Sequence, residues 1–92
     1  MEDKKGFIYI LKSLKNSRYY IGSTINVDVR FKQHNQGNVK ATKNIRPLEI
    51  VFYQSYCNIE TARKMEMKLK SFKRKDFIEK IIKDGYIKIT PM

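Results

Sequence analysis

The chain has 92 residues, enough for one compact domain with a modest hydrophobic core, and this length disfavours a second domain. Lysine and arginine contribute 20 residues against 9 acidic ones, so the formal net charge is +11 and the domain attracts polyanions. Nucleic acid is the first candidate partner and an anionic membrane surface the second, while a basic domain without either partner is the plain alternative.

Cysteine usage and the N-terminal residues indicate a cellular compartment. Cys57 is the only cysteine, which excludes an internal disulfide and a cysteine-rich zinc site and fits a reducing environment. Residues 1–5 are charged and are not followed by the apolar core of a signal peptide. No apolar run approaches the length that spans a membrane. We therefore expect a soluble, cytoplasmic protein with no membrane association.

The first predicted element is a strand over residues 7–12, where aromatic and branched side chains alternate. Phe7, Tyr9 and Leu11 would share one face, and the two isoleucines between them would share the other. Because both faces are apolar, the pattern is typical of a central strand that is covered on both sides.

A second strand is predicted over residues 18–23, after the turn-forming residues 15–17, so the first two strands would form a hairpin. A helix should follow directly. Asn26 is a suitable N-cap for this helix, which would run to about Gln36 and end at Gly37.

Residues 37–47 are polar and basic, and we predict a loop there. Residues 48–56 alternate again and are predicted to form a third strand. Leu48, Ile50 and Phe52 would share one face of that strand, leaving the residues between them for the opposite face.

Two further helices complete the predicted order. The first begins near Asn58 and carries Ala62, Met65 and Leu69 as an inward stripe. The second covers about residues 74–84. Its inward residues would be Phe77, Ile78, Ile81 and Ile82, and Gly85 would end it.

The order ββαβαα predicts an α+β fold, in which helices flank a small, three-stranded, mainly antiparallel sheet. A single domain would span residues 1–92, with its core at about residues 6–84. Residues 85–92 would form a short strand or a tail. We expect a monomer or a weak dimer.

Tyr9 and Tyr20 lie on the two strands of the predicted hairpin, where opposed side chains come within ~5 Å of each other. Gly22 follows in the second strand, and a glycine there often marks the close approach of a ligand or of another backbone. A bulge, together with aromatic residues that simply favour strands, explains the same pattern. Taken alone, this structural explanation is the stronger one.

Arg30 and His34 are four residues apart and would share one face of the first helix. Arginine binds phosphate oxygens through two parallel hydrogen bonds, and histidine accepts or relays a proton near neutral pH. For an isolated pair of this kind, a solvated polar face is the more frequent explanation.

Glu66 lies on or beside the apolar stripe of its helix, because it is four residues from Ala62 and three from Leu69. A carboxylate buried there without a partner is costly, so a cation, a metal ion or a hydrogen-bond network should compensate it. A surface ion pair with Lys70, one helical turn later, is the equally weighted alternative.

Two basic segments are candidates for contact with nucleic-acid phosphates. The first lies in the loop and comprises Lys40, Lys43 and Arg46. The second continues from the helix of Glu66 and comprises Lys68, Lys70, Lys73, Arg74 and Lys75. Charge runs are usually solvated faces, but the basic character of the whole chain favours a phosphate-contacting surface.

The chain resembles the GIY-YIG nuclease family in five features. These are the pair Ile8-Tyr9, the triplet Tyr20-Ile21-Gly22, Arg30, His34 and Glu66. The likeness is greatest to its small stand-alone members, similar to the N-terminal nuclease domain of the repair protein UvrC. It covers about residues 7–75. There are two departures: Phe7 stands where the first motif has glycine, and the asparagine of many larger members has no counterpart after Glu66.

The resemblance implies a metal-dependent endonuclease that cuts DNA, in repair, recombination or other DNA processing. Glu66 would hold one divalent ion, Mg²⁺ or Mn²⁺, mostly through water. Arg30 would bind the scissile phosphate, with His34 beside it. Tyr20 would be the general base and Tyr9 would order water or phosphate. Because an ordinary phenol has a pKa of ~10, the base needs help from the metal, Arg30 or His34.

Other functions remain open at this point. A catalytically weak module that keeps the fold would bind DNA or RNA without cutting it. An RNA-directed or ribosome-associated protein fits the same charge, because a positive field does not distinguish DNA from RNA. A membrane-surface protein is disfavoured, since the basic residues are not paired with a strong exposed apolar face.

Overall fold

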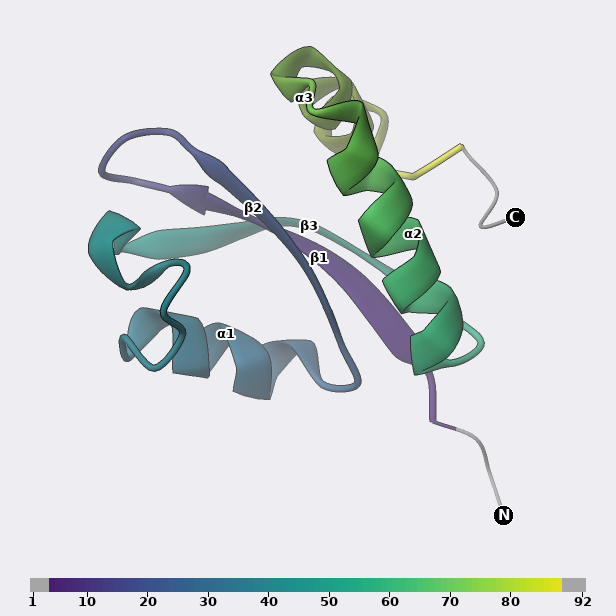
Figure 1. Ribbon diagram of the computed structural model, residues 1–92, viewed down its shortest axis with the longest axis horizontal. Coiled ribbons are helices and arrows are strands. Elements are labelled where there is room, and N and C mark those ends of the chain that lie inside the picture. Colours follow the sequence, from purple (N-terminus) through teal and green to yellow (C-terminus); the bar gives the residue numbers. More distant parts are fainter. Residues whose placement is uncertain (1–3, 89–92) are drawn as a thin grey trace.

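The computed structural model describes residues 4–88 and contains one sheet and three α-helices (Figure 1). In chain order the elements are β1 (Gly6–Ser13), β2 (Tyr19–Thr24), α1 (Val27–Asn35), the short 3₁₀ helix η1 (Lys43–Ile45), β3 (Leu48–Tyr56), α2 (Ile59–Phe72) and α3 (Lys75–Asp84). The predicted α+β fold with the order ββαβαα is therefore confirmed.

The sheet has the strand order β2-β1-β3, and β1 pairs antiparallel with both neighbours. This confirms the prediction of a central first strand. Figure 1 shows α1 on one face of the sheet and α2 with α3 on the other. Because β2 is at the edge of the sheet, its outer side is open between these two layers.

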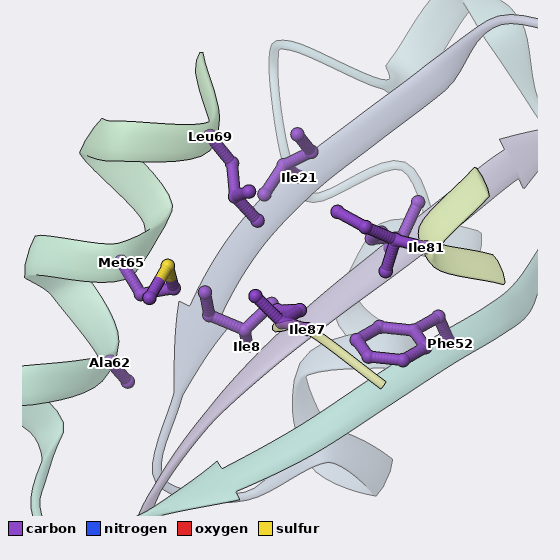
Figure 2. Close-up of a cluster of buried hydrophobic side chains, with 9 residues drawn as sticks. Ile8, Ile21, Phe52, Ala62, Met65, Leu69, Ile81 and Ile87 are labelled. Atoms are coloured by element: carbon purple, nitrogen blue, oxygen red, sulfur yellow. The ribbon is translucent and has the colours of Figure 1, made fainter. Parts of the chain in front are cut away.

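The larger hydrophobic cluster lies between the sheet and the α2–α3 layer (Figure 2). Its buried members are Ile8, Ile10, Ile21, Phe52, Ala62, Met65, Leu69, Ile81 and Ile87. The inward stripe predicted for α2 is thus confirmed. A smaller cluster of Tyr9, Leu11 and Leu48 lies under α1, so the two faces of β1 serve two different cores.

A bulge in β3 overturns one sequence prediction. Ile10 pairs with Phe52 but the next residue, Leu11, pairs with Ile50, so one residue of β3 is left over between them. Such an insertion reverses the alternation of side chains. Ile50 therefore packs in the α1 cluster while Phe52 is buried in the other one, and the expected shared face of Leu48, Ile50 and Phe52 is wrong.

The helix boundaries follow the predicted caps. The side chain of Asn26 accepts a hydrogen bond from the Val29 amide at 3.1 Å, and that of Asn58 accepts one from Thr61 at 2.8 Å. Gly37 and Gly85, with φ of 84° and 81°, adopt the left-handed conformation that ends α1 and α3.

Two connections, the predicted loop of residues 37–47 and the start of the segment predicted as a short strand or a tail, are tied to the core. Residues 37–47 contain η1 and the buried side chains of Val39 and Thr42. After α3, Ile87 packs into the larger core without forming a strand, and its amide donates to Gln54 Oε1 at 2.9 Å. The rest of the predicted C-terminal segment, residues 89–92, lies outside the described residues. Within residues 4–88, no helix has the length and apolar character needed to cross a bilayer.

Gly6 provides a test of how α2 is seated on the sheet. A Cβ added at Gly6 would overlap the backbone of Asn58 and Ile59, where α2 begins. Because the obstacle is backbone, Gly6→Ala should destabilise the fold by about 1–3 kcal/mol in urea unfolding. Lys5→Ala, at the exposed neighbouring position, is the control and should change stability by less than about 0.5 kcal/mol. Equal stability of the two variants would contradict this packing.

Candidate functional site

The five candidate catalytic residues come from four elements that meet around the edge strand. Tyr9 lies on β1, Tyr20 on β2, Arg30 and His34 on α1, and Glu66 on α2. Three of their rings form one cluster: the ring centroids of Tyr20 and His34 are 5.0 Å apart, those of Tyr9 and His34 5.6 Å, and those of the two tyrosines 6.4 Å. Residues distant in sequence therefore form a single aromatic group on the α1 side of the sheet.

A buried chain of hydrogen bonds supports this cluster. The Tyr9 hydroxyl lies 2.9 Å from Nε2 of His34, and Nδ1 of His34 lies 2.7 Å from the hydroxyl of Thr42. All three side chains are at most 2% exposed. Thr42 was missed by the sequence analysis, because nothing in a polar loop marks one threonine as buried.

Gly22 lies against a close neighbour, as a glycine within a strand suggested, and this neighbour is the side chain of Tyr9. Gly22 pairs directly with Tyr9, and a Cβ added to the glycine would overlap the Tyr9 phenol. The glycine therefore gives the phenol room to lie flat across β2 toward His34. Any larger residue at this position would displace Tyr9 from the cluster.

Burial sets the protonation states of Tyr9 and His34. Burial raises the pKa of the Tyr9 hydroxyl, although the nearby Arg30 guanidinium acts in the opposite direction. Burial, assisted by the positive charge of Arg30, lowers the pKa of His34 to about 4. At neutral pH the pair therefore consists of a protonated phenol and a neutral imidazole, which has one donor and one acceptor nitrogen.

Glu66 is on the other side of the edge strand and has two partners. Ser23 donates its hydroxyl to Oε1 of Glu66, and Nζ of Lys70 is 2.6 Å from Oε2. The Glu66 side chain is only 19% exposed. The ion pair proposed as the alternative for Glu66 is thus present, together with a hydrogen bond from a residue that the sequence analysis did not select.

Lys70 connects Glu66 to the aromatic cluster. Its ammonium group, besides pairing with Glu66, lies 5.5 Å from the centroid of the Tyr20 ring. Arg30 approaches from α1, where its Nη1 donates to Gln33 Oε1 at 3.0 Å. Positive charge therefore reaches the tyrosines from both layers of the fold.

The residues at Glu66 fit a hard cation better than a soft one. Among residues 4–88, no group of three or more His, Cys, Asp or Glu side chains is placed to hold a metal. A divalent ion at Glu66 would have a carboxylate and the Ser23 hydroxyl as nearby protein oxygens, with water filling its other positions. Oxygen ligands and retained water are what Mg²⁺ prefers.

The predicted phosphate-contacting residues fall into separate surfaces. Lys70, Lys73, Arg74 and Lys75 line one groove with Arg18 of the β1–β2 turn, over an apolar floor that includes Ile21 and Leu69. In that groove Arg74 is paired with Asp76 at 2.6 Å. Lys43 and Arg46 line a different groove with Lys15, while Lys40 and Lys68 line neither.

The chain is similar to known proteins over most of its length. The family model of the GIY-YIG catalytic domain matches residues 5–81. A UPF0213 protein of Staphylococcus haemolyticus is 35% identical over 78 residues, which cover 84% of this chain and 94% of that protein. The UPF0213 protein YazA of Bacillus subtilis is 37% identical over 76 residues, covering 82% of this chain and 76% of YazA. No solved structure matches the chain.

Because the His34 imidazole is buried, the free energy of unfolding should depend on pH. His34 titrates near pH 4 when folded and near 6.5 when unfolded, so its contribution to stability is complete above pH 6.5 and is lost as the pH falls toward 4. The unfolding free energy should fall by about 2–3 kcal/mol more between pH 7 and pH 4 in the wild type than in His34→Gln. Urea titrations at the two pH values measure this difference. Parallel pH profiles of the two proteins would refute it.

Proposed function

The chain belongs to the GIY-YIG catalytic domain family, and on this basis we propose that it is a metal-dependent endonuclease that hydrolyses phosphodiester bonds in DNA. Its fold is of the nuclease type. The observation that carries the proposal is the position of Lys70, which contacts the Glu66 carboxylate and the Tyr20 ring at the open edge of the sheet. This contact brings a candidate metal ligand and a candidate base to the same place.

Glu66 and Ser23 would hold a divalent ion, Mg²⁺ or Mn²⁺, at this edge. When bound, the ion would supply positive charge to the scissile phosphate and to the leaving oxygen. Lys70 now compensates the charge of Glu66. With Glu66 engaged in metal binding, the ammonium group of Lys70 would be released from the carboxylate and would bind a phosphate of the substrate.

Arg30 is suited to bind the phosphate at which hydrolysis occurs. Its guanidinium group is half-buried on α1 and reaches the same edge from the opposite layer. A fixed positive group beside a phosphate stabilises the extra charge of the transition state without having to reorganise. Arg30 would be such a group, and Lys70, once released from Glu66, would add a second positive charge from the other layer.

The two tyrosines are suited to different tasks. Tyr9 is buried, its pKa is raised and its hydroxyl is bonded to Nε2 of His34, so it stays protonated. In the tautomer in which Nε2 donates to the phenol oxygen, the O–H of Tyr9 is free to donate to water or phosphate. Tyr20 is half-buried and lies beside Lys70. We assign Tyr20 as the base: in its phenolate form it takes a proton from the attacking water as the new P–O bond forms and the bond to the leaving oxygen breaks.

His34 would act through Tyr9. As a neutral ring fixed by Thr42 and Tyr9, it holds the phenol over Gly22 and sets the direction of its hydrogen bond. The basic groove next to Lys70 would hold neighbouring phosphates in a manner that tolerates many sequences. A module that binds DNA or RNA without cutting it is the alternative.

The first test is the charge of Glu66. Glu66→Gln keeps the shape of the side chain and an oxygen for Ser23 but removes the charge, so cleavage should fall at least about 100-fold while binding persists. Initial rates should be measured on labelled single-stranded, duplex and branched DNA and on matching RNA, with Mg²⁺, Mn²⁺ or EDTA.

Glu60→Gln makes the same chemical change at an exposed position in the first turn of α2 and should leave the rate unchanged. Wild-type rates in Glu66→Gln would remove Glu66 from the mechanism. A wild-type protein that binds every substrate and cuts none with either metal would establish the binding module instead.

The second test separates the tyrosines. Tyr20→Phe removes a hydroxyl from a half-buried ring, so the rate should fall by about 100-fold with little change in melting temperature. Tyr9→Phe leaves a buried nitrogen of His34 without its partner, and should also cost about 1–3 kcal/mol of stability. If Tyr20→Phe stays active while Tyr9→Phe is inactive, the two roles must be exchanged.

A further inference from the structure

A third basic groove lies on the side of Glu66 away from Lys73. Its polar lining comprises Ser23, Thr24, Asn26, Arg30, Gln33 and Arg63. Arg30 comes from α1 and Arg63 from α2, so arginines from both layers line one groove beside the end of the edge strand. The described residues that line this groove include no acidic side chain.

Ser23 links this groove to the candidate catalytic site. It lines the groove and also donates its hydroxyl to Glu66. A ligand bound between Arg30 and Arg63 would therefore lie next to the carboxylate that is assigned to the metal.

The spacing along α2 places Glu66 between positive charges. Arg63, Glu66 and Lys70 are separated by three and four residues and so form one stripe on the surface of α2, and Lys73 follows as the C-cap residue of this helix. With a rise of 1.5 Å per residue, Arg63 is ~4.5 Å from Glu66 along the axis in one direction, and Lys70 is ~6 Å away in the other. A nucleic-acid backbone along this stripe would meet positive charge before and after Glu66.

We propose that Arg63, beside Arg30, binds the phosphate next to the scissile one, on the side opposite Lys70 and Lys73. The proposal rests on the proposed function and adds the path of the strand through the site. Arginine is suited to this task because its planar group donates two hydrogen bonds to one phosphate. The exposed side chain of Arg63 is accessible to such a ligand.

A salt titration of binding tests the subsite. Affinity for a fluorescent 12-nucleotide oligothymidine would be measured in EDTA, where no metal-dependent cleavage occurs. For single strands each neutralised phosphate contributes about 0.7 to the slope of log K against log salt. Arg63→Gln should make this slope less steep by about 0.7, and Arg63→Lys should keep the wild-type slope.

Lys64→Gln is the matched control, because it removes the same charge from the exposed neighbouring position on α2 and lines none of the described grooves around the site. Its slope should equal that of the wild type. In NMR titrations with thymidine 3′,5′-bisphosphate, the Nε–H signals of Arg63 and Arg30 should shift in the wild type.

Two outcomes overturn the subsite: equal slopes for Arg63→Gln and wild type, or an equal loss in Lys64→Gln. A wild-type protein that cuts no substrate would overturn the nuclease assignment but leave this binding result intact. If the wild type cleaves and Arg63→Gln keeps the wild-type slope, the nuclease assignment stands and the Arg63 subsite is wrong.

Discussion

The close contact between the Tyr9 phenol and Gly22 is the constraint around which the site is arranged. It places one tyrosine across the neighbouring strand, where it reaches the imidazole of His34 on α1. Because Thr42 holds the other side of the ring, the loop after α1 is tied to the centre of the sheet. A glycine, an imidazole and a loop threonine thus depend on one another through a phenol that is 2% exposed.

The open edge of β2 explains how residues from both layers come together in the candidate site. A side chain above the sheet and one below it are normally separated by the sheet itself. At an edge strand the two layers meet around a single chain, so Arg30 from α1 and Glu66 from α2 reach the same place. This arrangement also separates the tasks, because the aromatic cluster lies under α1 and the carboxylate lies beside α2.

Local patterns were sufficient to predict the elements. The Asn caps, the apolar stripe of α2 and the two apolar faces of β1 are each visible within a few residues, and the structure confirms them. The bulge in β3 could not be predicted, because an extra residue within a run of mostly apolar side chains does not produce a distinct sequence pattern. Thr42 and Ser23 were missed for another reason. Their hydrogen bonds to His34 and Glu66 join segments that are brought together only by the tertiary fold.

An unpaired strand edge usually carries the danger of pairing with the edge of a second molecule. Here β2 is the open edge beside the candidate site, and the groove along it is lined by basic residues. Two such edges repel each other, so the charges that attract a polyanion would also keep separate molecules from joining into a continuous sheet. Since salt screens this repulsion, protection against self-association should weaken under the same conditions that weaken nucleic-acid binding.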